Sequence, residues 1–155
     1  MNYENLASDA VLETVVVALK ERNITAVVVS TRDEALEKIK SLIPRNSPVM
    51  NGSSTTLKDI GFIDYLREGK HGWKNVHEEI LNEKDPVRQT RLRKEATLAD
   101  YFLGSVHAIT EEGQLVVASG SGSQIPSYAF SSDNVIWVAG AQKIVPDLGS
   151  AMKRL

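Results

Sequence analysis

The chain has no cysteine among its 155 residues. Without thiols it can form no disulfide, offers no thiolate nucleophile and supplies no cysteine ligand for zinc or an iron–sulfur cluster. Redox chemistry would therefore depend on a centre held by another protein, and we expect no cofactor in the chain itself.

Long apolar runs and a strong charge of one sign are also lacking. No stretch suits a bilayer-spanning helix, and the first residues carry acids and amides where a signal peptide has basic and apolar regions. We therefore expect a cytoplasmic location and no membrane partner. The 18 basic and 20 acidic side chains give a formal net charge of −2, which argues against nucleic acid as a partner.

Metal ligands at a usable spacing are missing as well. His71, His77 and His107 are too irregularly spaced to form a metal-binding motif, so no metal site is expected. A structural or surface role is the more common one for such isolated histidines.

The composition that remains is that of an ordinary folded protein, 42% hydrophobic and 25% charged. Helical and strand-like patterns alternate in the first part of the chain. Apolar spacing predicts a helix over residues 4–22, and the β-branched run TAVVVS at residues 25–30 predicts a central parallel strand. Further predicted elements are a helix after a Thr31/Glu34 capping box, a strand at residues 48–50, a helix over residues 56–67 with Thr56 and Asp59 as a second box, and a helix that begins at Asp85 and Pro86.

The second part of the chain is richer in strands. Residues 106–110 and 114–119 flank Glu111, Glu112 and Gly113, which predicts an antiparallel hairpin with the glycine at positive φ. A short helix at residues 126–130, a strand at residues 134–139 and a helix capped by Asp147 complete the pattern. We predict an α/β fold, a three-layer sandwich with a mostly parallel sheet plus one antiparallel hairpin, in a single domain over residues 1–155.

Ligands of such sheets bind beyond the carboxyl ends of the strands. Three loops are expected there, at residues 51–56, 119–124 and 140–143. In the first loop a glycine, four hydroxyls and a following helix N-terminus could hold a phosphate or carboxylate, although a single hydroxyl that caps the helix would explain part of the pattern. The candidate ligand-binding residues of this loop are Asn51, Gly52, Ser53, Ser54, Thr55 and Thr56.

The other candidates come from the later loops. Gly120, Gly122, Ser123 and Gln124 belong to a glycine-serine segment that could form a tight turn or a backbone anion site. Lys143 could neutralise an anionic ligand. Glu111 is the candidate nucleophile or general base, against the more common role of a solvated acid in a turn.

Several segments together resemble the LUD-type domain associated with lactate utilisation. They are ADYFLGS at residues 99–105, AITEEG at 108–113, GSQ at 122–124, VAGAQKIV at 138–145 and NGSSTTL at 51–57. The resemblance covers most of the chain, and family members usually continue beyond the segment that ends here at Leu155. We therefore expect the chain to lack that C-terminal continuation.

The resemblance implies the fold of ribose-5-phosphate isomerase and the CoA transferases. Gly52 to Thr55 are similar to the substrate loop of the sugar-phosphate enzymes, and Thr110 to Gly113 are similar to the turn that carries the CoA-transferase glutamate, with Glu112 where those enzymes have asparagine. LUD-type proteins are associated with bacterial oxidation of lactate, in which separate subunits carry iron–sulfur clusters. This cysteine-free chain resembles the partner without clusters.

Three functions follow from these observations. The chain could be an accessory or ligand-sensing subunit of lactate metabolism with iron–sulfur oxidoreductase partners, an enzyme for a phosphorylated sugar or an acyl-CoA that uses Glu111 and the loop at Gly52, or an interaction module whose loops are only turns. A homo-oligomer is left open.

Overall fold

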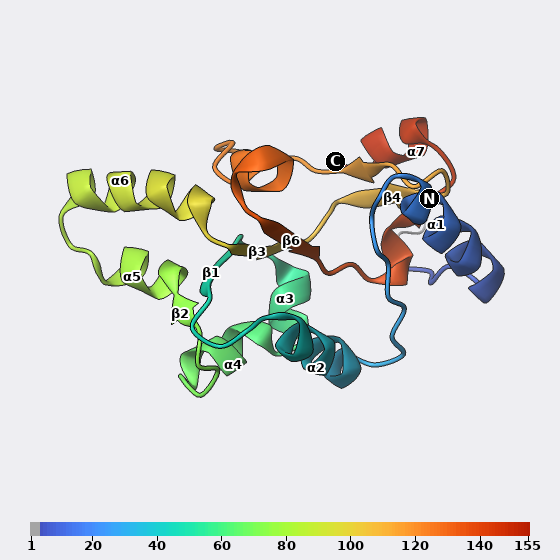
Figure 1. Cartoon of the computed structure of the whole chain (residues 1–155). Coiled ribbons are helices and arrows are strands. Elements are labelled where there is room, and N and C mark those ends of the chain that lie inside the picture. The colour runs from blue at the N-terminus through green and yellow to red at the C-terminus, as the bar shows by residue number, and fades with distance from the viewer. Residues whose placement is uncertain (1–3) are drawn as a thin grey trace. The chain divides into compact units, whose positions relative to one another are not determined.

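The chain forms an α/β fold with two sheets in the computed structural model, which describes residues 4–155 (Figure 1). The described residues fall into two units. Unit 2 comprises Thr31–Ser105 and Ser119–Val138, and unit 1 comprises residues 4–30, Val106–Ala118 and Ala139–Leu155. The α/β class and the mostly parallel sheet are as predicted, whereas the single domain stays a prediction.

Unit 2 is built on a four-stranded parallel sheet, sheet A, with the strand order β2-β1-β3-β6. Its strands are β1 (Pro48–Asn51), β2 (Lys74–Asn75), β3 (Tyr101–Gly104) and β6 (Asn134–Trp137). Met50 pairs with Phe102, and Gly104 pairs with Trp137. Because side chains alternate along a strand, Phe102, Gly104 and Trp137 share one face, while Val49 and Leu103 share the other.

The Val49 face is covered by α2 (Arg32–Leu42), α3 (Thr55–Asp59) and α4 (Phe62–Arg67). Ile39, Leu57 and Phe62 are buried in this core with Leu103. Each such side chain contributes about 1.5–3 kcal/mol when fully buried. The core therefore fixes these three helices on the sheet.

The other face is covered by η2 (Ser127–Ser131), a turn of π-helix in which Tyr128 packs edge-on against Phe102 at 5.2 Å between ring centroids. Sheet A thus lies between two helical layers, as the three-layer prediction requires. Three hydroxyls fix η2: Ser127, Ser131 and Ser132 all donate to the backbone oxygen of Thr97, at 3.2, 2.6 and 3.2 Å.

The helices α5 (Val76–Asn82) and α6 (Pro86–Glu95) form a hairpin in the same unit, followed by the 3-10 turn η1 (Ala96–Leu98) (Figure 1). Asp85 caps α6 by accepting from the Val87 amide at 2.9 Å, and Pro86 is at the first helical position. The Gln89 amide nitrogen donates to the backbone oxygens of Ile80 and Glu83 and ties the two helices together. The predicted start of this helix is confirmed.

Unit 1 contains α1 (Asp9–Glu21), a small sheet, η3 (Ala141–Lys143) and α7 (Leu148–Met152). The sheet has the order β5-β4-β7, in which β4 (Ala108–Thr110) is antiparallel to β5 (Leu115–Val116) and parallel to β7 (Ile144–Val145). The hairpin prediction is confirmed, with Gly113 at φ 80°. Gly113 also lies so close to α1 that a β-carbon there would be 2.8 Å from the backbone of Ala18.

Three predictions about elements are corrected by the structure, and one strand was missed. Residues 25–30 form no strand, and Val27 and Val28 are more than half exposed. The helix over residues 56–67 is two helices, because Gly61 adopts a left-handed φ of 77° between α3 and α4. The cap of α3 is Ser54, not Thr56. The strand β3 was not predicted, although it is the buried centre of the larger sheet.

Candidate functional site

Three parallel strands of sheet A end at one edge, at Asn51, Gly104 and Trp137. Such an edge is where open α/β sheets usually bind ligands. The segments that follow β1 and β3, together with the residues just before and within η2, bring polar groups to it. We call this group the strand-end cluster: Asn51, Gly52, Ser105, Gln124, Tyr128 and Trp137.

Two glycines make the cluster sterically permissible. A β-carbon on Gly52 would collide with the side-chain amide of Gln124, whose Cδ would be 2.8 Å away. A β-carbon on Gly104 would collide with the Tyr128 hydroxyl and be 2.8 Å from its Cζ. Gln124 and Tyr128 therefore reach over the ends of β1 and β3 only because these two positions have no side chain.

Tyr128 links the segments by hydrogen bonds. Its hydroxyl donates to Gln124 Oε1 at 3.1 Å and accepts from the backbone N–H of Ser105. Burial raises the pKa of Tyr128, and the Ser105 amide opposes this in part. The hydroxyl is therefore a neutral donor at physiological pH.

In the predicted loop at residues 51–56, two of the four hydroxyls contact other residues and two belong to exposed residues. Ser54 accepts from the Leu57 amide at 3.2 Å and so caps α3. Thr56 is 3.3 Å from the Ser105 hydroxyl, which also donates to the Val138 oxygen. Ser53 and Thr55 are exposed. The capping interpretation thus accounts for Ser54 alone, and anion binding by this loop stays a prediction.

Asn51 ends β1 with a buried side chain that donates to the Gly52 oxygen at 3.3 Å. Its own backbone is hydrogen-bonded to His77, on the first turn of α5. Burial lowers the pKa of His77, the bond to Asn51 opposes this, and the charge of Arg93 lowers the pKa further. His77 is therefore held as a neutral ring beside the strand-end cluster.

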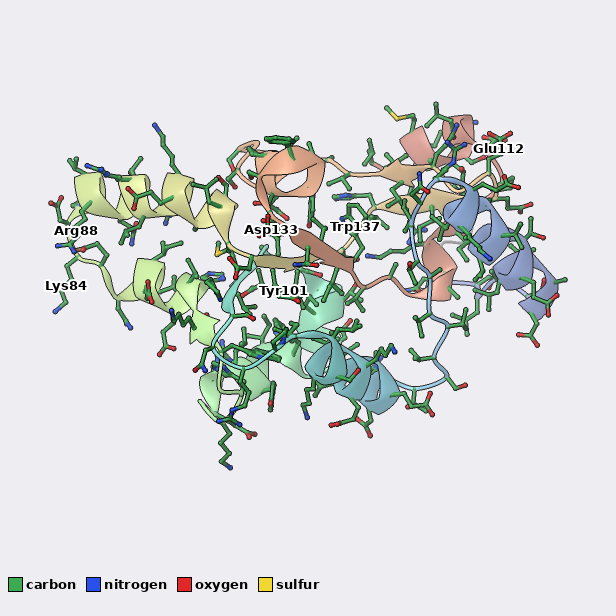
Figure 2. All side chains as sticks on the ribbon, viewed as in Figure 1. Lys84, Arg88, Tyr101, Glu112, Asp133 and Trp137 are labelled. Carbon is green, nitrogen blue, oxygen red and sulfur yellow. The ribbon has the colours of Figure 1, made fainter. Side chains whose placement is uncertain are left out.

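Trp137 contributes a buried hydrogen-bond donor, its indole N–H. Its ring lies 5.7 Å from that of Tyr128, and its buried indole N–H has no hydrogen-bond partner among the described residues. Figure 2 labels Trp137 on β6. Buried polar groups without a partner are uncommon, and one at the carboxyl edge of a parallel sheet is a reason to expect an acceptor from a ligand.

The glycine-serine segment forms a turn before η2. Gly122 adopts a φ of 71°, its oxygen accepts from the Ile125 amide, and the Ser121 and Ser123 hydroxyls are 3.0 Å apart. A side chain at Gly120 would meet nothing within 4 Å. Of this predicted group, Gln124 is the residue that the structure places against Gly52.

Glu111 and Lys143 belong to unit 1, whereas the other predicted site residues belong to unit 2. Glu111 is half-buried in the β4–β5 turn, where its amide donates to the Val145 oxygen at 3.0 Å, and Glu112 next to it is exposed (Figure 2). Lys143 Nζ donates to the Val106 oxygen at 2.9 Å. A joint site of these two residues with the loop at Gly52 stays a prediction.

Sequence reasoning missed four residues beside this edge, His77, Ser105, Tyr128 and Trp137. None of the four belongs to a local sequence motif that marks a binding residue. The usable signal was the position of Ser105 directly after the run YFLG, because residues at the end of a strand reach the binding edge of a parallel sheet.

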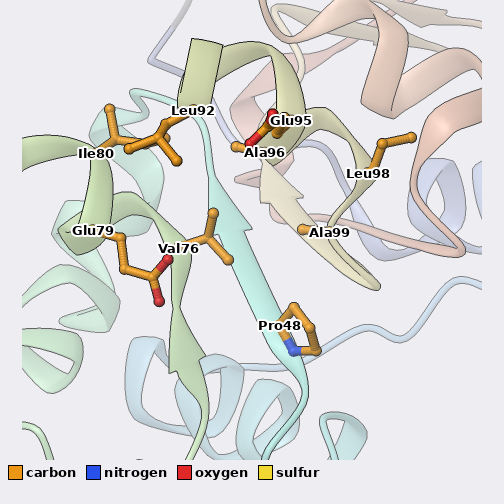
Figure 3. A pocket seen from close by; sticks show the side chains of 9 residues that line it. All are labelled: Pro48, Val76, Glu79, Ile80, Leu92, Glu95, Ala96, Leu98 and Ala99. Atoms are coloured by element: carbon orange, nitrogen blue, oxygen red, sulfur yellow. The ribbon is translucent and has the colours of Figure 1, made fainter. Parts of the chain in front are cut away.

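A cavity of about 210 Å³ lies at the opposite ends of the strands, between α5, α6 and the start of β1 (Figure 3). Pro48, which begins β1, and Ala99, which precedes β3, form its floor with Val76 and Ile80. It is separate from the strand-end cluster and was not predicted.

Comparison with family models finds one that matches residues 12–155, the LUD domain. The chain belongs to the LUD domain family. Comparisons with curated proteins and with solved structures found no match. Membership supports an association with lactate utilisation, and the likeness to the sugar-phosphate and CoA-transferase folds remains an expectation.

Two further properties bear on this LUD domain. Among residues 4–155, none of the helices combines the length and apolar character needed to cross a bilayer. The same residues contain no group of three or more histidine and acidic side chains arranged to hold a metal ion.

Proposed function

We propose that this LUD domain is a subunit of lactate utilisation that binds a small carboxylate at the strand-end cluster and carries no iron–sulfur cluster of its own. Family membership supports the pathway. The observation that supports the site is the unpartnered indole N–H of Trp137, buried beside Tyr128 at the carboxyl edge of sheet A.

The donors at this edge suit an uncharged cradle for an anion. Gln124 Oε1 already accepts from Tyr128, so the amide nitrogen of Gln124 is left to donate. The Trp137 indole N–H and the exposed hydroxyl of Ser53 are further donors. Neutral donors bind a carboxylate more weakly than a guanidinium does, which suits a metabolite present at high concentration.

A binding experiment tests this site. We expect lactate or pyruvate to raise the melting temperature and to change tryptophan fluorescence, because a ligand bound only by the native state stabilises it. The variant Gln124→Ala should abolish both effects, while Tyr101→Phe, at the opposite end of β3, should retain them. Sugar phosphates and CoA esters serve as competing ligands, and a response to them alone would exclude the carboxylate.

The proposed partner is an iron–sulfur oxidoreductase, since the cysteine-free chain cannot ligate a cluster through thiolates. Affinity purification of the tagged chain from lactate-grown cells should recover such a subunit, and deletion of the chain should impair growth on lactate. Recovery of no oxidoreductase together with normal growth would exclude this role.

An enzyme for an acyl-CoA or a phosphorylated sugar is the second candidate. The observation that favours it is the turn at Glu111, fixed by bonds between Thr110 and Gly113 and between Glu111 and Val145. For any such substrate found by screening, Glu111→Gln should remove turnover if the carboxylate is the nucleophile. Glu112→Gln is the matched control, and equal turnover in both variants would dismiss the nucleophile.

A further inference from the structure

The helix α6 is unusual because none of its ten residues is buried. Helices of this length owe most of their stability to the packing of an apolar face. On this hairpin and the η1 turn that follows it, apolar side chains are instead exposed: Leu81 by 66%, Val87 by 79% and Leu98 by 69%. The hairpin therefore presents apolar surface that its own unit does not cover.

The cavity of Figure 3 lies on this same hairpin. Its walls are mainly apolar, with Ile80 from α5 and Leu92 from α6 among them, and two carboxylates, Glu79 and Glu95, line it as well. Glu95 is paired with Arg91 at 2.8 Å. Glu79 forms no ion pair with any residue in the described part of the chain, so it remains as an uncompensated acid at an apolar hollow.

The hairpin also carries apolar and basic side chains that complement the hollow in character and charge. Val87, Arg91 and Lys94 are spaced by four and three residues, so they lie along one face of α6. All three are exposed, and Lys94 has no ion pair within residues 4–155. We call these three residues the basic stripe. Figure 2 shows Lys84 and Arg88 at the end of the hairpin where α5 turns into α6.

We propose that the α5–α6 hairpin is a homodimer interface, in which the basic stripe of one copy covers the cavity of the other and Lys94 faces Glu79 of the second copy. An isologous interface needs both complementary surfaces on one patch of the same chain. This hairpin meets that condition: the basic stripe lies on α6, and α5 and α6 form walls of the acid-lined apolar hollow, which η1 and the start of β1 complete. Binding to a different protein would not require this chain to carry both the acidic hollow and the basic stripe.

Charge exchange gives the first test, read as the dimer dissociation constant from sedimentation or light scattering over a range of concentrations. Lys94→Glu and Glu79→Lys should each weaken the dimer by at least about tenfold, because like charges then meet across the interface. The double variant should recover most of the loss. Lys58→Glu, an exposed lysine on α3, makes the same charge change elsewhere and should leave the dimer unchanged.

Cysteine pairing gives the second test, and it is clean because the chain has no cysteine of its own. Glu79→Cys and Lys94→Cys are placed on differently tagged copies, mixed and oxidised. We expect a disulfide between the two tags, and none when Lys58→Cys replaces the Lys94 variant.

A chain that is monomeric at every concentration, or a dimer that neither charge reversal weakens nor the cysteine pair links, would overturn the proposal. Both reversed positions are exposed, so the variants should fold, which circular dichroism checks.

Discussion

Two glycines at the strand ends differ in how rigid their neighbours are. The obstacle at Gly52 is the flexible end of Gln124, whereas the obstacle at Gly104 is the ring of Tyr128, held against Phe102 and Trp137. A flexible amide can move aside, but a packed ring cannot. The two positions should therefore respond differently to the same added methyl group.

We predict that Gly104→Ala lowers the free energy of unfolding by about 1–3 kcal/mol, the usual range for overpacking. Gly52→Ala should cost less. In the double variant with Tyr128→Phe the loss should be smaller than the sum of the single losses, because the hydroxyl nearest to the added β-carbon is gone. Denaturant unfolding of the four variants measures this, and strict additivity would contradict the contact.

His77 sets the direction in which folding stability changes with pH. Its pKa is lowered in the folded state from 6.5, mainly by burial, so the unfolded chain binds the proton more readily. Its contribution to stability is complete above the unfolded pKa and is lost as the pH falls through the folded pKa.

We predict that stability decreases from pH 7 to pH 5 and that His77→Gln flattens this part of the profile. Asn82→Gln, at an exposed residue of α5 without a titratable side chain, is the control and should leave the slope as it is. Melting temperatures at half-unit pH steps measure both, and an unchanged slope in the His77 variant would refute the assignment.

Among the elements, α3 depends most on its cap, because it has only five residues. Ser54→Ala removes the acceptor for the Leu57 amide and should cost about 1 kcal/mol. Ser53→Ala, one position earlier and exposed, should stay within about 0.5 kcal/mol of the parent. Urea midpoints at an unchanged slope measure the difference, and equal midpoints would show that Ser54 does not cap α3 in solution.

Helix starts could be read from the sequence because a cap is a local contact. Thr31 with Glu34, Asp85 with Pro86 and Asp147 all cap the helices predicted for them. Strands, in contrast, depend on partner strands that lie elsewhere along the chain. Residues 25–30 have strand composition but no partner, whereas the four residues of β3 are a strand because β1 and β6 flank them.

The candidate site follows the same rule. Residues 51–56 and 119–124 could be predicted as loops because glycine and serine mark turns locally. Tyr128 and His77 could not, since their contacts to Ser105 and Asn51 join segments more than twenty residues apart.

For the chain as a whole, the exposed valines and the small net charge act together. The formal charge is −2 and the isoelectric point is about 5.9, so electrostatic repulsion between molecules is weak near that pH. Val27, Val28 and Val29 are exposed in a segment that forms no strand, and such β-branched runs readily pair between molecules.

We predict that aggregation beyond any dimer is greatest near pH 5.9, as measured by light scattering and thioflavin T fluorescence. Val28→Glu should reduce it strongly. Val17→Glu adds the same charge at an equally exposed valine, but within the hydrogen-bonded backbone of α1, and should reduce it less. Equal effects would assign the aggregation to net charge alone.

The anchoring of the π-helical turn η2 should tolerate single mutations. Three serine hydroxyls compete for the single backbone oxygen of Thr97, which has two lone pairs. Two hydroxyls are enough to occupy both lone pairs, so the loss of one serine hydroxyl leaves two donors to this oxygen. We therefore expect the replacement of any one of these serines to leave Tyr128 over the ends of the strands.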